Sequence, residues 1–223
     1  MFVGHFAVGF AGKKFAPKQN AAVLMMAPLF LDIVFPVLIL AGVEKAHVRP
    51  GITKVMPVSL DSMPWSHSLL MSIVWSVLYA GVVFGVTKDR RGAVVCALLV
   101  FSHWICDWVT HSPDMQLWPG NETRVGLGLW NSLWGTITVE LVMLVIGGYL
   151  YLSSTKAKDR VGAIVPIVFM VFLTIVYLAN VFGPPPPSVK IFSLGIVAGL
   201  LLIPLIIWYD RHRVPVGAVA SSG

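Results

Sequence analysis

Three ionisable side chains stand inside one strongly apolar segment, Ser102-His103-Trp104-Ile105-Cys106-Asp107-Trp108-Val109-Thr110-His111. They are His103, Asp107 and His111, at positions i, i+4 and i+8. On an α-helix each step of four residues drifts only about 40° around the axis, so the three side chains line one face. Lipid cannot hydrate such a face, and ionisable groups inside a bilayer usually contact a cavity, a partner or an ion. The segment therefore predicts a spanning helix with a polar site on one side.

The composition is that of an integral membrane protein. Apolar residues make up 57% of the 223 residues and charged residues 12%, and the mean hydropathy is +0.83. The formal net charge is +6, but the basic residues form small groups between apolar runs, as membrane flanks do. We therefore expect no nucleic-acid partner.

The expected fold class is an all-α membrane protein with about six transmembrane helices. The spans are expected at residues 21–42, 66–86, 92–111, 131–152, 161–182 and 191–209. They form one transmembrane domain over residues 1–209, followed by a cytoplasmic tail at 210–223. The patterns Gly81-x-x-x-Gly85 and Gly195-x-x-x-Gly199 predict places where helices approach closely.

The loops alternate in charge. Eleven basic residues fall on one side of the membrane and five on the other, so the positive-inside rule predicts that both termini are cytoplasmic. In that orientation the third span runs outward through His103, Asp107 and His111. Asp32 in the first span and Glu140 in the fourth then lie between the midplane and the outer surface, and His67 lies nearer that surface.

The apolar stretch at residues 2–12 is too short to span a bilayer. One interpretation is a half-helix inserted from the cytoplasmic side, with His5 about 12 Å deep. The alternative is a helix lying in the interface with His5 on its polar face. Because the stretch lacks a basic n-region, we expect it to be retained and not cleaved as a signal peptide.

The buried ionisable residues are typical metal ligands. Imidazole and carboxylate groups bind zinc and other divalent ions, and an HxxxD spacing directs two ligands to one centre. The setting strengthens the hypothesis, because further ionisable groups are expected at similar depth: His5, Asp32, His67 and Glu140. The alternative is that His103 and Asp107 form a hydrogen-bonded pair that fixes helix packing.

These residues also resemble a known family, the bacterial inner-membrane proteins described as membrane-bound metal-dependent hydrolases, one of which is LexA-regulated. The resemblance covers roughly the first 120 residues and rests on four motifs: Gly4-His5, Ala27-Pro28-Leu29-Phe30-Leu31-Asp32, Trp65-Ser66-His67-Ser68-Leu69-Leu70, and Ser102-His103-x-x-x-Asp107 followed by Leu117-Trp118-Pro119. It implies that a divalent metal, with zinc the expected ion, is held by His5, Asp32, His67, His103 and Asp107. His111, with Ser112-Pro113-Asp114, resembles a subgroup variation.

The chain departs from the family pattern at two places. Many relatives carry Asp-x-Asp-His where this chain has Asp32-Ile33-Val34-Phe35, and Gly-His-Arg upstream of the Thr/Ser-His-Ser motif where it has Asp61-Ser62-Met63-Pro64. Three interpretations stay open: one metal instead of two, compensation by His111 and Glu140, or a site without catalysis.

The expected function is a metal-dependent hydrolase of the inner membrane that acts on a lipid or lipid-linked (phospho)ester through metal-activated water. Glu140 or Asp114 is the candidate general base. One alternative is a non-enzymatic accessory subunit of a membrane complex, with a protein partner. Another is a transporter or proton pathway built from Asp32, His103, Asp107 and Glu140, although the spans show no repeat of the kind that transporters use.

Overall fold

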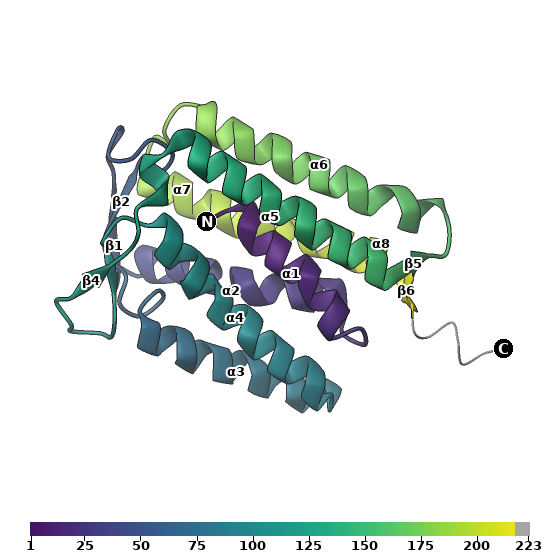
Figure 1. The fold of residues 1–223 in the computed structure, drawn as a ribbon. Helices are drawn as coiled ribbons and strands as arrows, with labels where there is room; N and C mark the ends of the chain where they lie inside the picture. Colours follow the sequence, from purple (N-terminus) through teal and green to yellow (C-terminus); the bar gives the residue numbers. More distant parts are fainter. Residues whose placement is uncertain (217–223) are drawn as a thin grey trace.

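The computed structural model describes residues 1–216, and nearly all of their regular structure is helical (Figure 1). In this part of the chain six helices are long and apolar enough to cross a membrane, which confirms the expected fold class. They are α2 (Ala21–Leu40), α3 (Leu69–Thr87), α4 (Arg90–Thr110), α5 (Leu133–Ser154), α6 (Arg160–Phe182) and a sixth made of α7 (Val189–Ala198), the 3₁₀ turn η2 (Gly199–Leu202) and α8 (Ile203–Arg211).

Side-chain caps mark the start of five of the six spans, all but α4. Asn20, Ser68, Ser132, Asp159 and Ser188 each accept a hydrogen bond from a backbone N–H of the first turn, which satisfies a donor that the helix leaves unpaired. The observed helix boundaries lie within a few residues of those expected from hydropathy.

The short N-terminal helix α1 (Val3–Phe15) lies inside the bundle, between α5, α2 and α4 (Figure 1). Val3, Phe6 and Phe10 join the largest hydrophobic cluster, and the His5 side chain is fully buried. This placement favours the inserted half-helix over a helix lying in the interface. At its other end, Lys13 forms a buried ion pair with Asp210 of α8, with Nζ 2.8 Å from Oδ2.

The close helix contacts are not where the small-residue patterns predict them. Apart from the chain neighbours and the local backbone of the same helix, no atom lies within 4 Å of a Cβ built on Gly81, Gly85, Gly195 or Gly199. The expectation of tight packing at these glycines is therefore wrong for the described chain. Tight packing occurs on α1 instead. A Cβ at Gly147 of α5 would overlap the Ala7 carbonyl group, and one at Gly9 would lie 2.6 Å from the Met25 Cα.

Short antiparallel strand pairs, which the sequence reading did not predict, close both ends of the bundle. The pairs β1 (Lys45–Val48) with β2 (Val58–Ser62) and β3 (Met115–Gln116) with β4 (Arg124–Val125) lie at one end, near the 3₁₀ turn η1 (Leu129–Asn131). At the other end β5 (Thr155–Ala157) pairs with β6 (Arg213–Pro215). The expected boundary of the tail at residue 210 stays a prediction, and residues 217–223 lie outside the described part.

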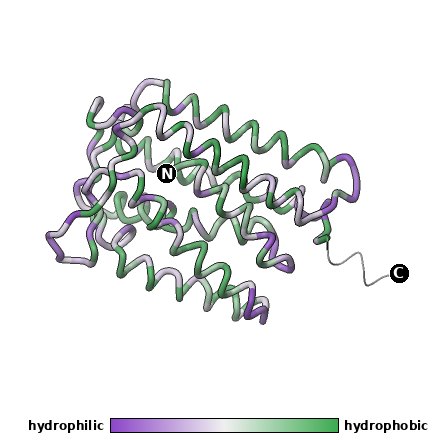
Figure 2. The backbone as a smooth tube through the Cα atoms, viewed as in Figure 1, coloured by the Kyte–Doolittle hydropathy of each residue, from purple (hydrophilic) through white to green (hydrophobic). Residues whose placement is uncertain are grey.

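The surface of the helical part suits lipid. Large apolar side chains point outward along the spans, including Val77, Val82, Val145 and Val168. Hydrophilic segments gather at the two ends of the bundle and hydrophobic ones lie between them (Figure 2). The buried polar side chains are enclosed by helices and lie away from this apolar surface.

Candidate metal centre

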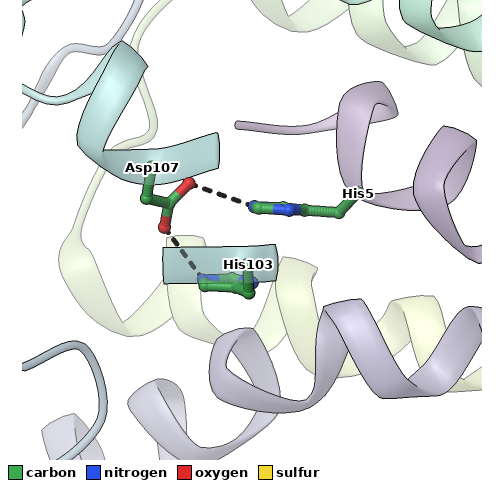
Figure 3. Close-up of side chains that lie close together, drawn as sticks. All are labelled: His5, His103 and Asp107. Carbon is green, nitrogen blue, oxygen red and sulfur yellow. Dashed lines mark hydrogen bonds and ion pairs between the residues drawn. The ribbon is translucent and has the colours of Figure 1, made fainter. Parts of the chain in front are cut away.

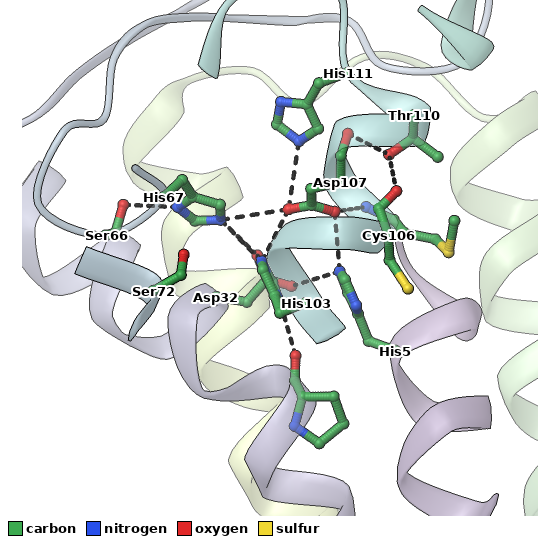
Figure 4. A network of polar contacts seen from close by, with 12 residues as sticks. His5, Asp32, Ser66, His67, Ser72, His103, Cys106, Asp107, Thr110 and His111 are labelled. Carbon is green, nitrogen blue, oxygen red and sulfur yellow. Dashed lines mark hydrogen bonds and ion pairs between the residues drawn. The ribbon is translucent and has the colours of Figure 1, made fainter. Parts of the chain in front are cut away.

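Six ionisable side chains named from the sequence converge at one place. They are His5 of α1, Asp32 of α2, His67 just before α3, His103 and Asp107 of α4, and His111 just after α4 (Figure 4). All are buried except Asp32, whose side chain is 28% exposed. Four separate segments of the chain thus supply one cluster.

Asp107 lies at the centre of the cluster. Its Oδ1 lies 3.1 Å from His5 Nε2, and its Oδ2 lies 2.8 Å from His103 Nε2 (Figure 3). Oδ2 also lies 3.6 Å from His67 Nε2 and 3.5 Å from His111 Nε2. The i, i+4 spacing in α4 explains how His103 and Asp107 meet on one helical face.

The geometry fits a divalent metal ion. Potential ligand atoms of His5, His103 and Asp107 lie within 4.8 Å of one another, and so do those of Asp32, His67 and His103. Ligands bound about 2.0–2.2 Å from zinc lie roughly 3–4 Å apart in a tetrahedron, which matches the separations in this cluster. Because His103 belongs to both groups, the two sets share one centre or form two adjacent ones.

Two rings, those of His103 and His67, are hydrogen-bonded on the side away from the cluster. His103 Nδ1 lies 2.6 Å from the Pro28 carbonyl oxygen, which can only accept, so Nδ1 carries the proton. His67 Nδ1 lies 2.7 Å from Ser66 Oγ. The Nε2 atoms of His67 and His103 lie 3.1 Å apart inside the cluster. In the neutral ring, the His103 Nε2 lone pair faces the site, as a metal ligand requires.

His5 and His111 are held differently. The His5 ring stacks on His103, with centroids 4.0 Å apart, and its Nδ1 has no hydrogen-bond partner among residues 1–216. His111 Nδ1 lies 2.9 Å from Asp114 Oδ1, so this carboxylate orients His111 Nε2 toward Asp107. The loop that follows His111 returns past it at Gly126, where a Cβ would overlap the Ser112 carbonyl oxygen, so a glycine is needed for this close approach.

The two candidate general bases make contacts that the sequence reading did not anticipate. Glu140 Oε2 accepts the backbone N–H groups of Phe2 and Gly4, at 2.8 and 3.2 Å, so Glu140 caps the start of α1 and thereby positions His5. Asp114 lies behind His111 and is partly exposed. The Met1 amino group donates to Asp107 Oδ1 at 2.6 Å. The general-base roles stay predictions.

Two buried polar residues near His67, Glu44 and Ser66, were not predicted to have a role at the site. Glu44 lies between α2 and β1, next to Lys45, in a polar connection of the kind that is usually solvated. Its side chain is instead buried and contacts Ser66. Only the three-dimensional return of the Trp65–His67 segment to the end of α2 identifies it.

The model of the YdjM inner membrane protein family matches residues 1–182, which include every residue of the cluster. No curated protein and no solved structure matches the chain.

Proposed function

Because this chain belongs to the YdjM inner membrane protein family, and is therefore a multi-pass inner-membrane protein, we propose that it is a metal-dependent hydrolase. Its substrate would be a lipid or a lipid-linked (phospho)ester. The family is that of membrane-bound metal-dependent hydrolases, and the buried His and Asp cluster is where the reaction would occur.

One observation carries the proposal. The Nε2 atoms of His67 and His103 lie 3.1 Å apart, beside the carboxylates of Asp32 and Asp107. If both rings are neutral and both Nδ1 atoms carry the protons, the lone pairs and the carboxylates repel one another. A divalent cation relieves that repulsion and balances the two negative charges, and mixed imidazole and carboxylate ligands suit zinc.

The residues have distinct tasks in this proposal. The ion is held from the closed side of the cluster by His67, His103 and Asp107. His5 provides a further ligand from α1. A bound ion supplies Lewis acidity, which lowers the pKa of a water molecule and polarises an ester or phosphoryl oxygen. Asp32 lies on the more open side, since its side chain is 28% exposed. A catalytic metal keeps one coordination position for water or substrate, and the side next to Asp32 is where water could reach it.

The location of the cluster favours an amphiphilic substrate. It lies among spanning helices, near the end of α4 that is closed by the β1–β2 and β3–β4 pairs. If the more basic loops are cytoplasmic, as the positive-inside rule predicts, that end faces outward. The expectation of a cytoplasmic N-terminus does not extend to Met1 itself, whose amino group is buried beside Asp107. A lipid can present its headgroup bond there from within the membrane, whereas a soluble polymer would have to enter the bundle. Asp114 and Glu140 are the carboxylates available as general bases.

The test is metal analysis of the protein purified without chelator, together with the His103→Ala and Asp107→Ala variants. We expect about one or two equivalents of a divalent ion in the parent and loss of the bound ion in both variants. His47→Ala is the matched control, because His47 is 63% exposed and pairs with Asp61 outside the cluster. Absence of stoichiometric metal from the parent contradicts the proposal.

Turnover is tested separately on detergent-solubilised lipid phosphoesters and carboxylic esters. We expect hydrolysis by the parent that is lost in His103→Ala and retained in His47→Ala. Bound metal without turnover of any of these substrates would instead support a structural metal site in an accessory subunit.

A further inference from the structure

A buried carboxylate lies behind His67, on the side away from the cluster. Glu44 is 2% exposed and Ser66 is fully buried. Glu44 Oε1 accepts the backbone N–H groups of Trp65 and Ser66, both at 2.8 Å. Glu44 Oε2 accepts the Ser66 hydroxyl at 2.6 Å. Three hydrogen bonds therefore fix this side chain against the segment that carries His67.

The direction of each proton follows from the chemistry of the groups. An ionised carboxylate only accepts hydrogen bonds, so the single Ser66 hydroxyl proton points to Glu44. Ser66 Oγ then offers a lone pair to His67 Nδ1, which lies 2.7 Å away. His67 must carry its proton on Nδ1. Its Nε2 is left as the lone-pair atom that faces Asp32, His103 and Asp107.

We propose that Glu44 is a positioning residue for the metal centre, which acts through Ser66 to hold His67 in the tautomer that binds metal through Nε2. This inference rests on the proposed function for its metal. Hydrogen-bond partners behind a ligating histidine fix both the tautomer and the ring orientation. Here the partner is a relay of two residues.

The relay has counterparts at the other rings. The Pro28 carbonyl holds His103 Nδ1, and Asp114 holds His111 Nδ1. These two partners act directly on the ring, whereas Glu44 acts through a hydroxyl that can reverse its direction. Because a hydroxyl both donates and accepts, only the acceptor-only carboxylate keeps the Ser66 proton away from His67.

Glu44→Gln tests this relay, because the glutamine amide has nearly the same shape as the glutamate carboxylate. The glutamine oxygen can still accept from Trp65 and Ser66, but its NH₂ group donates to Ser66 Oγ. The Ser66 proton can then turn to His67 Nδ1 and move the ring proton to Nε2. We expect zinc affinity, measured by competition with a chromophoric chelator, to fall about 10- to 100-fold.

Serine variants provide the matched comparisons. Ser66→Ala removes the relay and should weaken zinc binding to a similar degree, while Ser66→Thr keeps the hydroxyl and should retain the parental affinity. Ser76→Ala is the control, because Ser76 is also buried but donates only to the Ser72 carbonyl of its own helix. Equal loss in Ser76→Ala would indicate general destabilisation and overturn the inference.

A second measurement needs no metal. The ¹⁵N shifts of the histidine rings report which nitrogen carries the proton, and His67→Gln identifies the His67 signals. We expect the Nδ1–H form in the metal-free parent and in Ser66→Thr, and a shift toward Nε2–H in Glu44→Gln. An unchanged His67 tautomer with parental zinc affinity in Glu44→Gln overturns the inference. If the parent binds no metal, the proposed function fails, and the tautomer result alone decides whether the relay exists.

Discussion

Asp107 is the residue on which the contacts of the cluster converge, so its charge should govern both metal binding and stability. Asp107→Asn keeps the size of the side chain but removes the negative charge that faces His5, His103 and the Met1 amino group. Removing one partner of a buried ion pair typically costs about 3–5 kcal/mol. We expect metal binding to be lost and the free energy of unfolding in detergent to fall by roughly that amount.

Asp61→Asn is the matched control for this prediction. Asp61 also contacts a histidine, His47, but both side chains are substantially exposed. Exposed pairs contribute about 0–1 kcal/mol, so this variant should retain both metal and stability. Equal destabilisation in the two variants would mean that burial of the Asp107 charge is not the cause.

Asp159, outside the spans, offers a pH test. Hydrogen bonds from the Gly162 amide and from His212 lower the pKa of its carboxyl group below the usual range. A carboxyl whose pKa is lower in the folded state adds stability above its unfolded pKa of about 3.9, and that stability is lost as the pH falls. Asp159→Asn keeps a helix cap but not the charge.

We therefore expect the parent to have the higher unfolding midpoint at pH 7 and the advantage over Asp159→Asn to shrink as the pH falls below about 4. Thermal unfolding of both proteins in detergent across this pH range measures the difference. A gap that is constant or widens in acid would contradict the assignment.

At the residue scale, the sequence predicted the members of the cluster better than the residues behind them. His103 and Asp107 follow from an i, i+4 spacing in an apolar segment. The expected depth in the membrane added His5, Asp32 and His67, and the motif resemblance grouped them. Glu44 could not be found this way. It is a single acidic residue in a polar loop, and its burial depends on a contact with Ser66 across 22 positions of the chain.

Among the elements, the packing of α1 on α5 is the contact most sensitive to side-chain size. A Cβ on Gly147 would overlap the Ala7 backbone, which cannot move without shifting α1 and the His5 that it carries. Overpacking of this kind typically costs about 1–3 kcal/mol. We expect Gly147→Ala to lower the unfolding free energy by that amount and to weaken zinc binding, as measured by denaturation in detergent and by chelator competition.

Gly81→Ala is the comparison, because open space surrounds that position on α3. Alanine is a better helix former than glycine by about 0.8–1.0 kcal/mol, so this variant should lose no stability. If Gly81→Ala destabilised the protein as much as Gly147→Ala, the close approach of α1 to α5 could not explain the effect.

The two glycines also show which element-scale features a sequence conveys. Hydropathy marks the six spans because each is a continuous run of apolar residues. Which glycine lies at a helix contact depends on how the helices are arranged, so Gly81 and Gly85 resemble a packing motif yet face open space. The short strand pairs have too few residues to give a periodic signal, and α1 is too short to be classified by hydropathy alone.

For the molecule as a whole, the centre is a product of tertiary folding. It takes residues from α1, α2, the segment before α3, and α4, and the three helices α1, α2 and α4 also pack on one another outside the cluster. Apolar packing and the Lys13–Asp210 ion pair also fix α1. We therefore expect the metal-free protein to stay folded and to retain its helical circular dichroism after chelation.

A metal that binds only the folded state should nevertheless stabilise it. At a free zinc concentration 100 times the dissociation constant, the gain is about 2.7 kcal/mol, and a protein of this size should gain roughly 2–4 °C in unfolding midpoint per kcal/mol. We therefore expect zinc to raise the unfolding midpoint of the parent and of His47→Ala by several degrees. A chelator should reverse the rise. In His103→Ala the midpoint should not respond to zinc, because His103 belongs to both sets of potential ligands. An equal rise in His103→Ala would place the stabilising ion elsewhere on the molecule.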